Sequence, residues 1–143
     1  MGTGTGTDSP IGWVAKHIDS YVRTDGRTGG RFSGHDSLLL TTRGRRTGVP
    51  RRTALFYWRE GDPYVVVASN GGVTSYPDWY LNLRADPEVV LQVGADVFVA
   101  VARPVTGAER ARLWTLVVEG FPKYARYREK AGRDLPIVVL RAA

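Results

Sequence analysis

Short runs of apolar and β-branched residues, separated by turn signals, dominate the middle and the end of this chain. Such runs are typical of half-buried or buried β-strands. The pattern predicts six strands, at residues 37–42, 52–60, 64–69, 89–93, 97–103 and 136–140. Tight turns join the first strand to the second and the fourth to the fifth. The sequence therefore predicts two β-hairpins, with tips at residues 43–51 and 94–96.

Apolar residues recur at helical spacing in three other segments. The predicted helices span residues 11–22, 77–84 and 106–118. Thr106, followed three positions later by Glu109, has the pattern of a capping box that opens the third helix. Strands and helices do not alternate as they do in parallel nucleotide-binding folds. The order predicts an α+β fold in which a small antiparallel barrel of about six strands carries short helices at its ends.

The chain of 143 residues has the length of one domain, which we assign to residues 11–143. Residues 1–10 have the sequence MGTGTGTDSP, which lacks core-forming side chains and predicts a disordered tail. No basic start with a following apolar run indicates a signal peptide. No apolar run approaches the roughly 20 residues of a membrane-spanning helix. We therefore expect a cytoplasmic protein.

The composition narrows the possible chemistry. The absence of cysteine excludes disulfides, thiolate metal sites and a cysteine nucleophile, and the two histidines, His17 and His35, lie far apart. The sequence therefore predicts no metal site, and any redox chemistry requires a bound cofactor. Lysine and arginine outnumber aspartate and glutamate by 20 to 14, a net charge of +6. This excess favours an anionic partner: nucleic acid, acidic lipid or a phosphorylated small molecule.

The tip of the first predicted hairpin concentrates positive charge. Residues 43–52 have the sequence RGRRTGVPRR, with five arginines around two glycines. Guanidinium forks, glycine N–H groups and neighbouring hydroxyls together suit a phosphate. Two alternatives stay open, a solvated basic turn and a contact with nucleic acid. The second lacks a separate aromatic stacking platform.

Three further segments carry candidate chemistry, each beside a purely structural alternative. The sequence ASNGG at residues 68–72 ends a strand in a corner whose backbone can approach a flat heterocycle or form an ordinary loop. Trp79 and Asn82 share a helical face, where they would border a cofactor or act as a core plug and a helix-end amide. Tyr124 and Tyr127, also three residues apart, would wall a pocket or pack on the barrel.

In combination these segments resemble one family. From Leu38 to Leu140 the ordered motifs are LLLTT-x-GR-R-TG-x-x-R, V-A-S-N-GG, P-x-WYLNL-x-A-x-P, A-E-R-x-x-LW, P-x-Y-x-x-Y and LPIVVL. Each motif alone is weak, but the ordered set is specific and is similar to that of the deazaflavin-dependent nitroreductases. This resemblance implies a split β-barrel that binds reduced coenzyme F420, in a family best represented by quinone and nitroimidazole reductases.

The resemblance also implies roles for residues that match the motifs. The phosphate or the oligoglutamate tail of F420 would be held by Arg45, Arg46 and Arg51. The ring and its linker would be lined by Ser69, Asn70, Gly71 and Gly72, and bordered by Trp79 and Asn82. The acceptor side would be formed by Phe121, Tyr124 and Tyr127. The best-known nitroreductase has lysine at Asn70 and tyrosine at Phe121. The second difference favours quinone reduction over nitroimidazole reduction.

The sequence therefore predicts hydride transfer from reduced F420 to a quinone-like, nitro or other conjugated acceptor. Tyr124 and Ser69 are the predicted catalytic residues, because a hydroxyl donor stabilises the charge that develops on an acceptor oxygen. The alternatives are a non-catalytic F420 carrier and a split barrel that binds FMN. We expect a monomer without a nucleic-acid partner. Residues 11–22 would cover an apolar surface or the substrate entrance, or make peripheral contact with a membrane.

Overall fold

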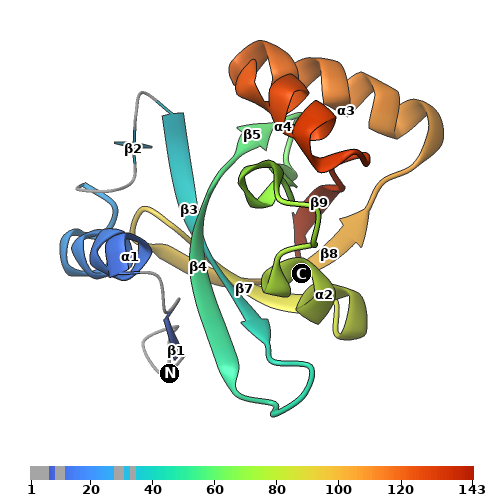
Figure 1. The fold of residues 1–143 in the computed structure, drawn as a ribbon. Helices are drawn as coiled ribbons and strands as arrows, with labels where there is room; N and C mark the ends of the chain where they lie inside the picture. Colours follow the sequence, from blue (N-terminus) through green and yellow to red (C-terminus); the bar gives the residue numbers. More distant parts are fainter. Residues whose placement is uncertain (1–6, 9–11, 28–30, 33–34) are drawn as a thin grey trace.

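The computed structural model describes residues 7–8, 12–27, 31–32 and 35–143 (Figure 1). Its longer strands are β3 (His35–Arg43), β4 (Pro50–Phe56), β6 (Tyr64–Val67), β7 (Glu88–Val93), β8 (Asp96–Pro104) and β9 (Ile137–Ala142). The two-residue strands are β1 (Thr7–Asp8), β2 (Arg31–Phe32) and β5 (Trp58–Arg59). The helices are α1 (Gly12–Thr24), the short 3₁₀ helix η2 (Asn70–Gly72), α2 (Asp78–Ala85), α3 (Gly107–Gly120) and α4 (Lys123–Ala131).

The strands form one curled sheet in the order β1-β4-β3-β7-β8-β9-β6-β5, with β2 paired to β3. Every pair is antiparallel except β1 with β4. The six predicted strands and both hairpins are confirmed. The predicted strand at 52–60 is divided at Tyr57, which lies between the end of β4 and the start of β5. This break produces β5 as an additional short strand.

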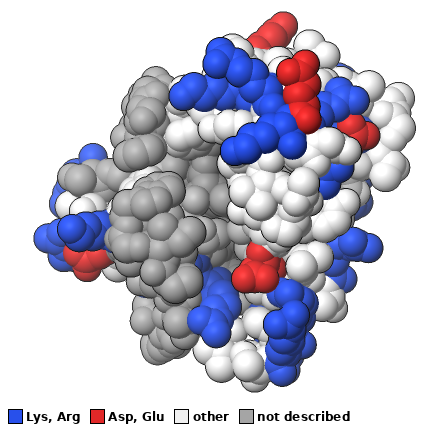
Figure 2. Space-filling model, in the orientation of Figure 1, with Lys and Arg blue, Asp and Glu red and all other residues white. Residues whose placement is uncertain are grey.

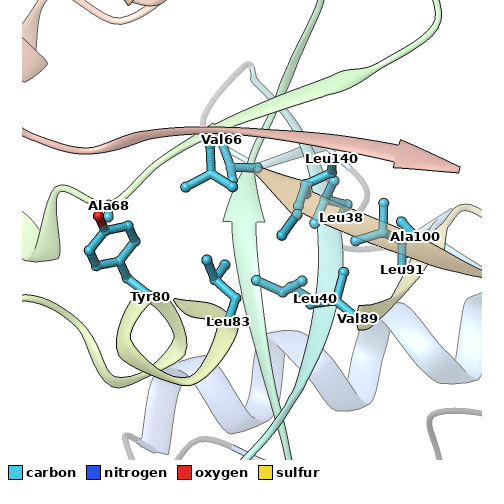
Figure 3. Close-up of a cluster of buried hydrophobic side chains, with 12 residues drawn as sticks. Leu38, Leu40, Val66, Ala68, Tyr80, Leu83, Val89, Leu91, Ala100 and Leu140 are labelled. Atoms are coloured by element: carbon cyan, nitrogen blue, oxygen red, sulfur yellow. The ribbon is translucent and has the colours of Figure 1, made fainter. Parts of the chain in front are cut away.

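The alternation of side chains along β3 explains its unbroken apolar run. Leu38 and Leu40 point to one face of the sheet and join the main core beneath α2, which Figure 3 shows in close-up. Leu39 points to the opposite face and packs against Ile18 and Tyr21 of α1. Because β3 is covered on both faces, a strictly alternating pattern is neither needed nor present.

A second core lies beneath α3 and α4, which Figure 1 shows together on one side of the sheet. Valines of β6 and β9 meet the apolar side of these helices there. The buried residues of this second core are Val65, Val67, Val105, Leu113, Val117, Tyr124, Ala131, Leu135, Ile137 and Val139. The predicted acceptor residues Phe121, Tyr124 and Tyr127 therefore belong to a hydrophobic core separate from the one beneath α2.

Helix α1 confirms the prediction of a helix near residues 11–22 and shows what it covers. Tyr21 is fully buried, and its hydroxyl lies 3.2 Å from the carbonyl oxygens of Ser37 and Gln92. The same hydroxyl accepts the N–H of Gly94 at 2.7 Å. Tyr21 thus fastens the end of α1 to the sheet. The side chain of Trp13 lies outside the described residues. Among those that are described, no helix combines the length and apolarity needed to cross a membrane.

A helix and a helix cap differ from the sequence predictions. Residues 123–131 form the helix α4, which was not predicted because charged residues dominate the segment and leave little apolar periodicity. Thr106 precedes α3 but makes no side-chain cap. Glu109 instead binds Arg103 through two hydrogen bonds of 2.7 and 3.0 Å, so an ion pair replaces the capping box.

The predicted disordered tail at residues 1–10 needs a correction at Thr7–Asp8. These two residues form β1, which runs parallel to β4 opposite Arg51 and Arg52. A sheet edge can pair with any backbone that reaches it, so the absence of apolar side chains did not preclude this strand. The rest of the tail lies outside the described residues.

The packing of Gly120 at the junction of α3 and α4 can be tested by substitution. A Cβ atom on Gly120 would overlap the indole of Trp58, and it would lie 2.8 Å from Cε2. We expect Gly120→Ala to destabilise the fold by about 1–3 kcal/mol through overpacking. Denaturant unfolding measures this, with Glu119→Ala, exposed on the same helix, as the control. Equal stability of the two variants would contradict the packing described here.

Candidate active site

The tip of the β3–β4 hairpin is locked onto α2 by a buried amide. Asn82 accepts hydrogen bonds at Oδ1 from the Arg45 guanidinium at 2.8 Å and from the Arg45 main chain at 3.2 Å. Its Nδ2 donates to the Thr42 hydroxyl at 3.2 Å. Arg45 also reaches Asp78 at 3.3 Å. Two predicted site residues, Arg45 and Asn82, are thus brought together, and the contact fixes the turn.

Arg46 and Arg51 differ from Arg45 because their guanidiniums are exposed. Within the described part of the chain, neither side chain forms a hydrogen bond or an ion pair. Arg51 is paired in register with Thr42, so it shares the face of the hairpin that α2 covers. Figure 2 shows basic side chains at the lower edge of the molecule, where Figure 1 has this hairpin. Exposed, unpaired guanidiniums suit an anionic ligand.

The corner after β6 combines three consecutive residues with left-handed backbone. The φ angles of Asn70, Gly71 and Gly72 are 49°, 63° and 82°. Gly71 faces open space, whereas a Cβ on Gly72 would lie 3.1 Å from the Cα of Tyr127. The Gly72 N–H already donates to the Ser69 carbonyl at 2.9 Å. Gly72 therefore packs against α4, and the other residues of this corner form its surface.

Helix α2 lies beside this corner. Tyr80 of α2 and Ala68, the residue before Ser69, belong to the same core cluster and lie together in Figure 3. Trp79 is half-buried and packs against that cluster, with its ring centroid 6.3 Å from that of Tyr80. The helix thus connects the hairpin arginines to the Ser69 corner, and Trp79 serves as a partial core plug.

The predicted acceptor residues form one aromatic cluster. The ring centroid of Phe121 lies 4.9 Å from that of Tyr124 and 6.2 Å from that of Tyr127. Tyr124 also packs edge-on against Trp58 at 5.5 Å. Only 4% of Tyr124 is exposed, and its hydroxyl has no hydrogen-bond partner among the described residues. A buried phenol with an unused proton can donate to a ligand oxygen.

Sequence reasoning missed His35, the first residue of β3, as part of this cluster. Its Nε2 lies 2.9 Å from the carbonyl oxygen of Gly120. Its ring stacks on Phe56 at 4.9 Å and meets Phe121 edge-on at 5.2 Å. His35 therefore ties β3 to the α3–α4 junction that carries Phe121. No local sequence pattern indicates this contact, because His35 and Gly120 are 85 residues apart.

Buried phenols make the stability of the fold sensitive to alkali. Desolvation by burial is the main cause that raises the pKa values of Tyr21, Tyr57 and Tyr124. In the unfolded chain these phenols titrate near pH 10. Their contribution to stability is therefore complete below about pH 10 and is lost as unfolded phenols ionise at higher pH. We expect the melting temperature to fall from pH 9 to pH 11, and less steeply in Tyr124→Phe. An equal slope in both proteins would contradict this cause.

Two surface cavities lie elsewhere. One, of about 250 Å³, is bounded by the β5–β6 turn, β9 and α3, and includes Leu113 and Val139 in its lining. The other, of about 430 Å³, lies along α1. None of the residues predicted for the cofactor or the acceptor lines either cavity. The candidate site therefore lies away from both cavities, and is built from the hairpin, α2, the Ser69 corner and α4.

The chain is similar over most of its length to proteins of one family. The family model described as F420H(2)-dependent quinone reductase matches residues 13–142. An F420H(2)-dependent quinone reductase of Mycobacterium tuberculosis is 41% identical over 141 residues, which cover 90% of this chain and 95% of the relative. A solved F420-H2 dependent reductase, FDR-A, is 38% identical with a TM-score of 0.68, and the match covers 73% of this chain and 93% of that one.

A second solved chain, described as a domain-swapped dimer, is 34% identical with a TM-score of 0.70. It matches 93% of this chain over its whole length. The curled antiparallel sheet and these likenesses confirm the predicted split barrel. On the match over residues 13–142, the chain belongs to the F420H(2)-dependent quinone reductase family and is an oxidoreductase.

Proposed function

We propose that this chain catalyses hydride transfer from reduced F420 to a quinone at the candidate site between the β3–β4 hairpin and α4. The observation that carries the proposal is the pair of exposed, unpaired guanidiniums of Arg46 and Arg51 on a hairpin that Asn82 locks to α2. Such fixed cations fit the phosphate and carboxylates of F420. They have no described partner that an incoming anion must displace.

Arg46 and Arg51 would bind the anionic part of the cofactor, and Arg45 would shape the rim. Because Asn82 and Asp78 already engage the Arg45 guanidinium, its first role is to hold the turn. A turn fixed before binding loses less conformational freedom when the ligand arrives. Arg45 therefore contributes to F420 binding by fixing the turn before the cofactor arrives.

The corner after β6 would receive the ring and its linker. Ser69, Asn70 and Gly71 line this corner, and Gly71 presents a backbone surface without a side chain. Trp79 would border the ring from α2, as the order of the motifs implies. Gly72 supports the same corner from behind through its packing on Tyr127.

Phe121, Tyr127 and Tyr124 would hold the acceptor. Reduced F420, when bound, supplies the hydride, and the protein supplies orientation and charge stabilisation. Burial raises the pKa of Tyr124, so its hydroxyl keeps its proton and can donate to the acceptor oxygen. The Ser69 hydroxyl, at the cofactor corner, is the second donor. An apolar ring at Phe121 suits a quinone-like acceptor, and nitro compounds belong to the same proposal as further acceptors.

Separate titrations with F420 and FMN test the proposed cofactor. Quenching of the four tryptophans would report binding, since Trp79 lies at the proposed border. We expect F420 to bind much more tightly than FMN, with an affinity that falls as salt increases. Tighter binding of FMN would contradict the assignment of the hairpin and the corner. Binding of F420 without turnover would favour the alternative of a carrier.

The proposal extends to the oligomeric state of the protein and to its contact with a membrane. We infer a monomer, although one structural relative is described as a domain-swapped dimer. Light scattering at micromolar concentration distinguishes the two states. A peripheral membrane contact through α1 would use the side of the helix that faces away from the sheet, because Ile18 and Tyr21 are buried against it. Sedimentation with anionic vesicles tests that contact, and recovery of the protein in the supernatant would contradict it.

A further inference from the structure

One arginine outside the predicted site holds the loop that follows η2. Arg133, two residues after α4, donates from Nε to the Thr74 carbonyl at 2.7 Å. Its Nη2 donates to the carbonyls of Val73 at 3.1 Å and Ser75 at 2.9 Å. The same guanidinium lies 4.4 Å from the ring centroid of Tyr76. A single side chain therefore contacts four consecutive residues.

This loop has little apolar burial to order it. Its residues are exposed, with 48% of Val73 and 40% of Tyr76 open to solvent. Three carbonyl dipoles directed at one point repel one another unless a cation lies between them. The planar fork of arginine reaches several acceptors at fixed angles, whereas lysine offers only a compact charge on a flexible stem. The guanidinium thus holds three consecutive carbonyls of the loop in one arrangement.

The loop joins the two parts of the proposed site. The Ser69 corner precedes it, and α2, with Trp79 and Asn82, follows it. The Ser75 carbonyl that accepts from Arg133 also accepts from Nδ2 of Asn70 at 3.1 Å. A change in the loop is therefore passed directly to the corner. On its other side the corner is pressed against α4 through Gly72.

We propose that Arg133 is a positioning residue that keeps the Ser69 corner in the conformation that receives F420. This inference rests on the proposed function of the corner. Arg133 acts through the loop, by raising the fraction of molecules whose corner is competent to bind. When that fraction falls, the apparent dissociation constant rises in proportion. Saturating cofactor restores the competent form, so the maximal rate is retained.

The test compares Arg133→Ala, Arg133→Lys and Arg128→Ala. We expect Arg133→Ala to raise the Kd and KM for reduced F420 roughly tenfold while kcat at saturation stays within about twofold. Arg133→Lys should restore part of the affinity, because the charge remains and the fork is lost. Arg128→Ala removes a guanidinium from the same region that pairs with Asp134, and it should match the wild type. Hydrogen exchange at residues 70–76 should quicken only in the Arg133 variants.

Failure of this inference is distinct from failure of the proposed function. A wild-type protein that does not bind F420 would overturn the function itself. If the wild type binds F420 and Arg133→Ala has the same Kd and KM, the positioning role is overturned. A loss of kcat and melting temperature with an unchanged KM would also overturn it. That result would assign Arg133 to general stability.

Discussion

Replacing both Arg46 and Arg51 by alanine is expected to weaken F420 binding by about a hundredfold or more. A hydrogen bond to a charged group contributes about 1.5–3 kcal/mol, which corresponds to roughly ten- to a hundredfold for each arginine. Both guanidiniums are exposed and unpaired among the described residues, so their loss should act mainly on the bound state. Fluorescence titration of the double variant measures the effect directly.

Arg43 provides the matched control for this experiment. It lies on the same hairpin, one position along β3 from Thr42, so its side chain points to the opposite face from Arg51. Arg43→Ala removes one positive charge, half of that lost in the double variant, and should change the Kd only about twofold, through long-range electrostatics. Arg45→Ala should lower affinity and also loosen the hairpin, because the hydrogen bond from the guanidinium to Asn82 is lost. Equal losses of F420 affinity in Arg43→Ala and in the double variant would contradict the assignment. They would mean that the hairpin attracts anions only through its overall positive charge.

Tyr124→Phe and Ser69→Ala are each expected to lower the rate of quinone reduction while F420 binding is retained. Removing one positioned donor to a developing oxyanion commonly costs about 10²–10³ in rate. Tyr124 is a buried residue whose hydroxyl is protonated and has no described partner, so its loss leaves packing nearly unchanged and removes a donor. Steady-state kinetics with a soluble quinone gives kcat for each variant.

The controls for the donor prediction come from the same chain. Tyr64→Phe removes a phenol that packs against Tyr57 and Phe98, away from the acceptor cluster, and should keep full activity. His17→Ala should also change the rate little, because the mechanism needs no acid–base histidine. Full activity in both Tyr124→Phe and Ser69→Ala would overturn the assignment and move the proton donor to solvent or to another group.

The strand pattern of this fold could be predicted because it depends on local information. Apolar runs and turn residues sufficed for the six longer strands, and the arginine-rich hairpin tip was placed at the correct turn. Helix α4 was missed because the segment from Lys123 onward is mostly charged, and it is held by Tyr124 and Ala131 in the second core. Its helical state depends on tertiary packing more than on its own pattern.

The contacts that organise the site could not be predicted from spacing. Arg45 and Asn82 are 37 residues apart, and Arg133 is about 60 residues from the loop it holds. The resemblance places Gly72 beside the cofactor, and the structure adds that its backbone packs against α4, a helix that the sequence pattern does not predict. The motifs identified which segments form the site. Only the folded chain shows which of their residues face solvent and which support the others.

The account is tested most directly by mixing the purified protein with reduced F420 and a quinone under anaerobic conditions. Oxidation of F420 is then followed by absorbance, and hydroquinone is quantified in parallel. We predict oxidation that requires both protein and quinone, saturates with each substrate, and yields hydroquinone and oxidised F420 in equal amounts. Tight binding of F420 without quinone-dependent oxidation would contradict the account and leave the chain as a carrier of the cofactor.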